Sequence, residues 1–271
     1  MTLLESPLFS PLAIAPMINW SDTYFRVLMR LLAPNALLYT EMQTPNAIKH
    51  QPIRALYHHP AEYPLALQLG GSDPAALADA AKAGEAAGFS EINLNLGCPS
   101  SRVLAGCFGA SLMSNPKQVS ACISAMKRAV SIPVTAKTRI GIDHDDSYEF
   151  FKQFVDVLIN AGCDKLIVHA RKAWLSGLNP KQNRTIPPLH YNYVHQIKSE
   201  LPKHIPVIIN GQIETLEQIN TQLQTLDGVM IGRLACREPY AIAEIHHALY
   251  PAIPKPKRTE VFENYLNYAA N

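Results

Sequence analysis

The 271-residue sequence has little of what marks several common classes of protein. It has five cysteines and no C-x-x-C pair, which predicts neither a disulfide framework nor a zinc site and favours a reducing, cytoplasmic setting. It has no apolar run of the roughly 18 residues that span a bilayer, and no secretory signal at its N-terminus. Its net charge of +2 does not by itself indicate nucleic-acid binding. We therefore expect a protein without a bound metal or a membrane span.

What the sequence does contain is one pattern, repeated eight times. Apolar, strand-like runs cover Leu12–Met17, Ala36–Met42, Leu65–Gly70, Glu91–Leu96, Val134–Arg139, Lys165–Arg171, Val207–Gly211 and Gly228–Arg233. Helical patterns lie between them, at about 21–32, 45–56, 73–88, 115–130, 146–162, 191–201, 215–223 and 238–249, the second being the weakest. Asp73-Pro74 and Asn115-Pro116 are typical helix starts, because an N-cap residue precedes a proline at the first helical position.

Eight strand–helix units in about 240 residues predict an α/β fold, the (β/α)8 TIM barrel. The main alternative is an open Rossmann-type sheet, which is disfavoured because no G-x-G-x-x-G follows the first strand. In a barrel, the chemistry lies at the carboxyl ends of the strands. The residues at those ends are therefore the candidates for a site.

Polar residues and glycines follow nearly every predicted strand. A buried polar group is costly unless it meets a ligand or a partner, so we expect these residues to meet at one barrel mouth. In chain order they are Pro16 and Met17, Glu41, Gln68, Asn95 and Cys98, Lys137 and Arg139, His169 and Arg171, Asn210 and Gly211, and Gly232 and Arg233.

The segment Glu91–Pro99, EINLNLGCP, is the most informative of these strand ends. Its alternating apolar residues stop at a Gly-Cys-Pro turn, which delivers Cys98 to the mouth. Asn95 can offer a donor and an acceptor to a planar polar ligand. A lone cysteine is more often a small core residue, and that alternative stays open from the spacing alone.

The last strand ends favour a phosphate site. Asn210-Gly211 and Gly232-Arg233 follow strands seven and eight, where many barrels bind phosphate. Lys137 could be a Schiff-base nucleophile, or a fixed cation facing a cofactor that becomes anionic. A phosphate site, an amide, a lysine and His169 around one cavity suit flavin mononucleotide, FMN, with Gln68 and Lys137 at the polar edge of the ring.

The segment from Arg171 to Arg184 points to a different ligand. It holds four cations (Arg171, Lys172, Lys181 and Arg184), no acid, and Trp174. Clustered cations with an aromatic residue suit RNA phosphates and a stacked base. The alternative is a solvated loop with a packed tryptophan.

Taken together, these motifs resemble those of the tRNA-dihydrouridine synthase family, most closely its 20/20a branch. The similarity runs in order from about residue 11 to residue 240. The matching pieces are APMINWSD (15–22), LYTEM (38–42), LALQLGGSDP (65–74), EINLNLGCPS (91–100), GASLM (109–113), TAKTRIGID (135–143), HARKAWLSGLNPKQNR (169–184), ING (209–211) and DGVMIGR (227–233).

The resemblance implies reduction of a D-loop uridine (20/20a) in tRNA to 5,6-dihydrouridine, with FMN as cofactor and NADPH as reductant. Hydride from flavin N5 would reach C6 of the uracil, and Cys98, as the catalytic acid, would protonate C5. An ordinary thiol, with a pKa of roughly 8.5, is mostly protonated at neutral pH and can supply that proton. FMN binding would fall to Pro16, Met17, Gln68, Lys137, His169, Asn210, Gly211, Gly232 and Arg233. Asn95 would hold the flipped uracil, and Lys181 and Arg184, with Arg171 from the same loop, would face the tRNA.

Two positions depart from the family pattern. Gln212 stands where a second glycine often follows Asn-Gly, and it would be strained if the backbone there has a positive φ. Relatives usually carry a helical tRNA-binding domain after the barrel. We expect residues 1–250 to form the FMN-binding barrel, and 251–271 to be a proline-containing linker and a truncated remnant of that domain.

Two other functions remain open at this stage. One is a flavin dehydrogenase of a free pyrimidine, although a free base offers no phosphates to the cations of the Arg171–Arg184 loop. The other is an RNA-binding flavoprotein that has lost catalysis, which the presence of both Cys98 and Lys137 disfavours.

Overall fold

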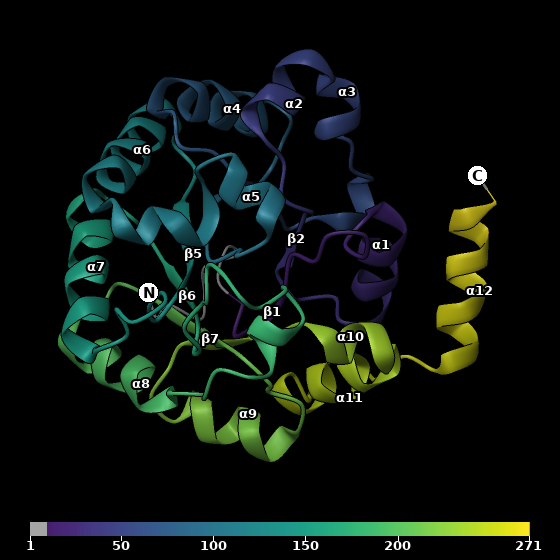
Figure 1. Cartoon of the computed structure of the whole chain (residues 1–271). Coiled ribbons are helices and arrows are strands. Elements are labelled where there is room, and N and C mark those ends of the chain that lie inside the picture. The colour runs from purple at the N-terminus through teal and green to yellow at the C-terminus, as the bar shows by residue number, and fades with distance from the viewer. Residues whose placement is uncertain (1–9, 271) are drawn as a thin grey trace.

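The computed structural model describes residues 10–270 and forms a closed parallel barrel ringed by helices (Figure 1). The strands are β1 (Leu12–Ile14), β2 (Leu38–Tyr39), β3 (Leu65–Leu69), β4 (Glu91–Leu96), β5 (Val134–Arg139), β6 (Leu166–His169), β7 (Val207–Asn210) and β8 (Gly228–Ile231). They are paired in the order β1-β8-β7-β6-β5-β4-β3-β2. A parallel bridge between Ala13 and Leu37 joins the two ends of this order and closes the barrel. The predicted (β/α)8 fold is confirmed.

The helices lie outside the strands, as the sequence pattern predicts. They are α1 (Thr23–Leu32), α2 (Pro45–His50), α3 (Pro52–Ala55), α4 (Pro74–Ala86), α5 (Ser101–Ala105), α6 (Pro116–Ala129), α7 (Tyr148–Asn160), α8 (Tyr191–Glu200), α9 (Leu216–Leu223), α10 (Arg233–Arg237), α11 (Pro239–Leu249) and α12 (Arg258–Ala269). The 3₁₀ turns are η2 (Pro60–Glu62), η3 (Gly109–Ser114) and η4 (Gln182–Arg184). Asp73 and Asn115 cap α4 and α6 as expected, accepting hydrogen bonds from Ala76 and Gln118.

Three local predictions differ from the structure. The helix expected over 45–56 is two short helices, because Pro52 has no N–H to continue α2 and instead begins α3. Helix α7 is capped by Ser147 rather than led by Asp146. Most predicted strands are longer than the real ones, since the residues past each strand end turn into the barrel mouth.

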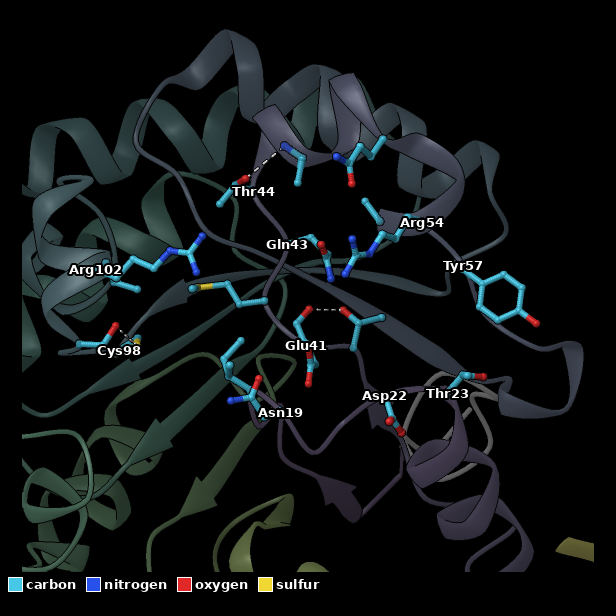
Figure 2. A pocket seen from close by; sticks show the side chains of 18 of the residues that line it. Asn19, Asp22, Thr23, Glu41, Gln43, Thr44, Arg54, Tyr57, Cys98 and Arg102 are labelled. Carbon is cyan, nitrogen blue, oxygen red and sulfur yellow. Dashed lines mark hydrogen bonds between the residues drawn. The ribbon is translucent and has the colours of Figure 1, made fainter. Parts of the chain in front are cut away.

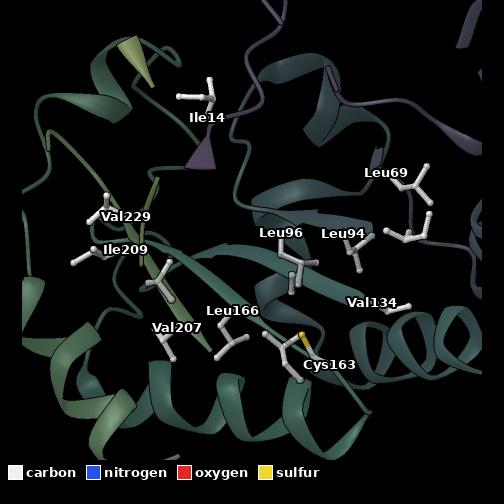
Figure 3. Packing of buried hydrophobic residues seen from close by; sticks show 14 of the residues in the cluster. Ile14, Leu69, Leu94, Leu96, Val134, Cys163, Leu166, Val207, Ile209 and Val229 are labelled. Carbon is white, nitrogen blue, oxygen red and sulfur yellow. The ribbon is translucent and has the colours of Figure 1, made fainter. Parts of the chain in front are cut away.

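Apolar packing fills the layer between the strands and the helices. Leu94 and Leu96 of β4 are fully buried in this layer (Figure 3), as is Ile92 of the same strand. The alternate residues of a strand point to its other face, which here is the inside of the barrel. A second apolar cluster lies inside the barrel and includes Ala13 and Met230. The core thus fixes which residues of each strand reach the mouth.

Residues after the last barrel helix return to the side of the barrel. Helix α12 packs against α1 (Figure 1), and the hydroxyls of Tyr268 and Thr23 lie 3.2 Å apart. The rings of Tyr24 and Tyr268 meet edge to face at 5.9 Å. No helix within residues 10–270 is long and apolar enough to cross a membrane.

Candidate active site

A cavity of about 1020 Å³ opens at the carboxyl ends of the strands. Thirteen of the fourteen site residues predicted from the sequence line it: Pro16, Met17, Gln68, Asn95, Cys98, Lys137, His169, Lys181, Arg184, Asn210, Gly211, Gly232 and Arg233. Six of its lining residues are lysine or arginine, and the one acid, Glu214, pairs with Arg237 at 2.9 Å. The cavity is therefore strongly positive in a protein of net charge +2, which suits a phosphorylated ligand.

Three contacts hold the Cys98 loop in place. The Asn95 side-chain oxygen accepts hydrogen bonds from the N–H of Gly97 at 3.2 Å and of Cys98 at 3.0 Å. Arg139 Nε donates to the Gly97 carbonyl at 3.0 Å. Gly109, at φ +71°, lies so close to this loop that a Cβ there would come within 2.6 Å of the Cys98 carbonyl oxygen. The half-buried thiol is consequently carried by a fixed backbone.

A continuous chain of buried hydrogen bonds runs through the barrel to Asn95. Lys165 pairs with Glu91, and Glu91 accepts from Tyr39 at 2.9 Å and from Thr135 at 2.5 Å. Asn93 donates to Thr135 at 2.9 Å, Gln68 donates to Asn93 at 2.8 Å, and Asn95 donates to Gln68 at 2.9 Å.

This chain sets which way both amides point. The Asn95 oxygen already accepts two hydrogen bonds, so Asn95 has only an N–H left to offer a ligand. The Gln68 oxygen accepts one bond, from Asn95, so Gln68 keeps one N–H and one acceptor position. Asn95 was expected to present both a donor and an acceptor to a planar ligand. The structure leaves it only as a donor.

Lys137 and His169 both lie where burial opposes positive charge. Burial, followed by the charge of the neighbouring Arg139, lowers the pKa of Lys137 to about 7. Its ammonium donates to Asn210 Oδ1 at 3.2 Å. Burial, followed by the charges of Arg139 and Lys137, holds the pKa of His169 well below its usual value, so the imidazole is neutral at pH 7.

Two residues in the turn after β7 have a positive φ, including Gln212, for which the sequence analysis considered this conformation. Gly211 has φ 131°, and a Cβ there would lie 3.0 Å from the His169 ring. Gln212 follows at φ 55°, so its backbone is strained as anticipated. Its side-chain oxygen accepts a hydrogen bond of 2.7 Å from Arg171.

Arg171 does not reach the cavity, in contrast to the prediction that it faces RNA. It is 4% exposed, and its guanidinium donates to Gln212 and to the carbonyl of Pro187. The structure thus gives Arg171 the role of holding the turn after β7.

The loop from Lys172 to Arg184 divides into a tethered part and an open part. Lys172 pairs with Asp146 at 2.6 Å and lies 4.6 Å from the centre of the Trp174 ring, so neither side chain is available as an open RNA contact. Buried Asn183 ties the loop together through both its N–H groups and its oxygen. Lys181 and Arg184 remain exposed on the cavity wall.

Comparison with known proteins identifies the family. The profile of the dihydrouridine synthase (Dus) family matches residues 13–270. The chain belongs to the dihydrouridine synthase family. It is therefore a flavin-dependent oxidoreductase by family, and the predicted resemblance is confirmed.

Curated relatives match most of the chain at about half of the positions. It is 53% identical over 237 residues to the tRNA-dihydrouridine(20/20a) synthase of Shewanella oneidensis, covering 88% of this chain and 70% of that protein. It is 51% identical over 261 residues to the protein of the same name from Synechocystis, covering 96% and 78%. The structure of histamine dehydrogenase from Rhizobium sp. 4-9 has the same fold, with a TM-score of 0.62, 14% identity, and coverage of 88% of this chain and 46% of that one.

Two residues that shape this dihydrouridine synthase site lie in the matching segments GASLM and HARKAWLSGLNPKQNR, but sequence reasoning assigned neither of them a role. Gly109 is needed by a contact with Cys98 that only the folded chain makes, and Asn183 is buried by its own loop. Among the described residues, no three His, Cys, Asp or Glu side chains come together as a metal site.

Proposed function

We propose that this chain uses FMN and NADPH to reduce a D-loop uridine of tRNA, at position 20 or 20a, to 5,6-dihydrouridine. The observation that carries the proposal is the single cavity in which Cys98, Asn95 and Lys137 meet. The names of the relatives, tRNA-dihydrouridine(20/20a) synthases, supply the substrate and the position.

The residues of the cavity fit FMN. Gln68 retains a free amide N–H, and Lys137 is a cation once an anion lies opposite, so the two suit the polar edge of the ring. Gly211 leaves room beside neutral His169, and Arg233 faces the phosphate in this assignment. The remaining FMN contacts are assigned to Pro16, Met17, Asn210 and Gly232. Bound FMN would supply the hydride that reaches C6 of the uracil.

Cys98 and Asn95 act on the uracil in this proposal. The Asn95 amide donates to a uracil carbonyl and draws electron density from the ring, since its oxygen is already engaged. The Cys98 thiol then protonates C5. Because Asn95 also holds the Cys98 backbone, one side chain positions both the base and the proton donor.

Lys181 and Arg184 contact tRNA phosphates at the rim of the cavity in this proposal. They are the two exposed cations of their loop. We assign residues 10–250 to the FMN-binding barrel, and α12 to a helical extension that contacts tRNA beside α1.

The direct test is to incubate the protein with FMN, NADPH and tRNA that lacks dihydrouridine, then map the product by mass spectrometry of nuclease fragments. The expected result is dihydrouridine at position 20 or 20a. Protein that binds FMN and oxidises NADPH but forms no product on any tRNA would refute the proposal.

A further inference from the structure

A second cavity, of about 690 Å³, lies beside the first. Its walls come from the start of α1, from α2 and α3, and from the segment that follows β2 (Figure 2). Cys98 and Ser100 line both cavities, so the two meet at the proposed proton donor. A ligand in the second cavity would therefore lie next to the base that Cys98 protonates.

The second cavity contains an unpaired carboxylate at its centre. Glu41 is half-buried just past β2, and its side chain has no hydrogen-bond or ion-pair partner within the part of the chain that the structure describes. Figure 2 shows it between Gln43 and Asn19. Because it has no internal partner, the Glu41 carboxylate is free to accept hydrogen bonds from a ligand in this cavity.

Two arginines flank that carboxylate on opposite walls. Arg54 and Arg102 point into the cavity (Figure 2), and neither is paired with any described residue. The third arginine of the cavity, Arg26, is already neutralised by buried Glu62. Free guanidinium groups around an opening suit phosphate, to which they bind bidentately.

We propose that this cavity binds a guanosine next to the target uridine, with Glu41 accepting from the base and Arg54 and Arg102 contacting its flanking phosphates. This inference rests on the proposed function. Guanine presents two adjacent N–H donors on its Watson–Crick edge, which match the two oxygens of a carboxylate. Adenine presents one donor beside a ring nitrogen lone pair that a carboxylate repels, so the geometry disfavours the adenosine half of NADPH as the occupant.

The test compares Glu41→Gln and the double variant Arg54→Ala/Arg102→Ala with matched surface changes. Glu244→Gln and Arg128→Ala are the controls, because both residues are exposed on outer helices away from either cavity. Affinity for tRNA is measured by filter binding with FMN-loaded protein and no NADPH. The kcat/KM for dihydrouridine formation and the KM for NADPH are measured separately.

Both cavity variants should bind tRNA roughly 10- to 100-fold more weakly, the range for hydrogen bonds to charged groups. Their FMN content and KM for NADPH should equal those of the controls. A tRNA with inosine in place of the neighbouring guanosine lacks one donor. This tRNA should bind the unchanged protein about 10-fold more weakly than the ordinary tRNA does. For Glu41→Gln, the two tRNAs should bind equally well.

Three outcomes would overturn the inference. Unchanged tRNA binding in both variants would show that the cavity is not a nucleotide site. A raised KM for NADPH with unchanged tRNA binding would assign it to the reductant. If inosine lowered the tRNA affinity of Glu41→Gln as much as that of the unchanged protein, Glu41 would not contact the guanine. Because binding is measured without turnover, these outcomes are separate from a failure of the proposed reaction.

Discussion

Lys137 shows how strongly the position of one residue sets its chemistry. Burial at the mouth and the charge of Arg139 lower its pKa to about 7, so the Lys137 amine is neutral in a fraction of the molecules at physiological pH. An anion placed opposite raises that pKa again and draws a proton onto the side chain. Binding of an anionic ligand is then linked to proton uptake.

The affinity for reduced FMN, which is anionic at the ring edge assigned to Lys137, should therefore depend on pH. Since binding raises the pKa of Lys137, affinity should be highest below pH 7 and fall as pH rises through 7, by up to about tenfold per unit. Anaerobic binding titrations with reduced FMN between pH 7 and 9 measure this dependence, because the pKa of Lys137 in the free protein is about 7. Lys137→Met should give a flatter profile. If affinity changed with pH equally in both proteins, Lys137 would not be the group that takes up the proton on binding.

Cys98 is the residue on which the proposed protonation depends. Cys98→Ala should lower dihydrouridine formation by roughly 10²- to 10⁴-fold, the usual contribution of a general acid. Reduction of the bound flavin by NADPH should persist, because that step needs no proton from Cys98. Stopped-flow absorbance follows the flavin and mass spectrometry the product. Cys163→Ala is the matched control, since that thiol is buried far from the mouth. Product at the unaltered rate in Cys98→Ala would contradict the assignment.

At the level of elements, strand ends hold one another in place through buried polar contacts. The hydrogen-bond chain starts at Lys165, immediately before β6, and links β4, β5 and β3 before it reaches the Cys98 loop. Arg171, past β6, in turn holds the turn after β7 through Gln212. The site is therefore supported by contacts between strands, and not by the loops alone.

Breaking the buried chain should disturb the site from a distance. Asn93→Ala leaves Gln68 and Thr135 without their partner and should cost about 2 kcal/mol of unfolding free energy. FMN affinity and kcat should fall as well, because the Gln68 and Asn95 amides lose their fixed orientation. Ser90→Ala, which removes another buried hydrogen bond of 2.9 Å, is the control. If Asn93→Ala, like Ser90→Ala, lowered only the stability, the hydrogen-bond chain would have no part in orienting the site.

The turn after β7 allows strain and hydrogen bonding to be separated. Gln212→Ala keeps the positive φ and loses the bond to Arg171, so it should destabilise the protein by about 2 kcal/mol. Gln212→Gly loses the same bond but relieves the backbone, and should be about 1 kcal/mol more stable than the alanine variant. Chemical denaturation measures both. An alanine variant as stable as the glycine variant would show that the backbone stores no strain.

Across the whole molecule, a small net charge conceals a strongly uneven distribution. The protein carries +2 overall, while the walls of the main cavity hold six cations and one paired acid. The charge balance of the complete sequence therefore says little about what the mouth attracts. A local field of this kind acts on polyanions and weakens with salt.

Binding of tRNA should show this field directly. Lys181→Ala/Arg184→Ala removes two proposed phosphate contacts and should lower the slope of log affinity against log salt by about 1.4 to 1.8. The control is Lys172→Ala, from the same loop, because that lysine is already paired with Asp146. FMN content should stay the same in all three proteins. A slope unchanged in the double variant would exclude these residues from the RNA-binding face.

The sequence alone determined the architecture and most of the site. Strand ends are local features, so alternation and glycine breaks in segments such as Glu91–Pro99 predicted which residues reach the mouth. Twelve of the fourteen strand-end residues line the main cavity, the exceptions being Glu41 and Arg171. Helix starts at Asp73 and Asn115 were equally local and were confirmed.

Only the tertiary structure decided what each polar group does at the mouth. Arg171 and Lys172 stand beside Lys181 and Arg184 in the sequence, yet the first two are occupied by Gln212 and Asp146. Asn95 lost its acceptor to the Cys98 loop, and Glu41 was left without a partner in a second cavity. These outcomes depend on which distant segments come within hydrogen-bond range. The spacing of residues along the sequence cannot predict these partners, because segments far apart in the sequence meet only when the barrel closes.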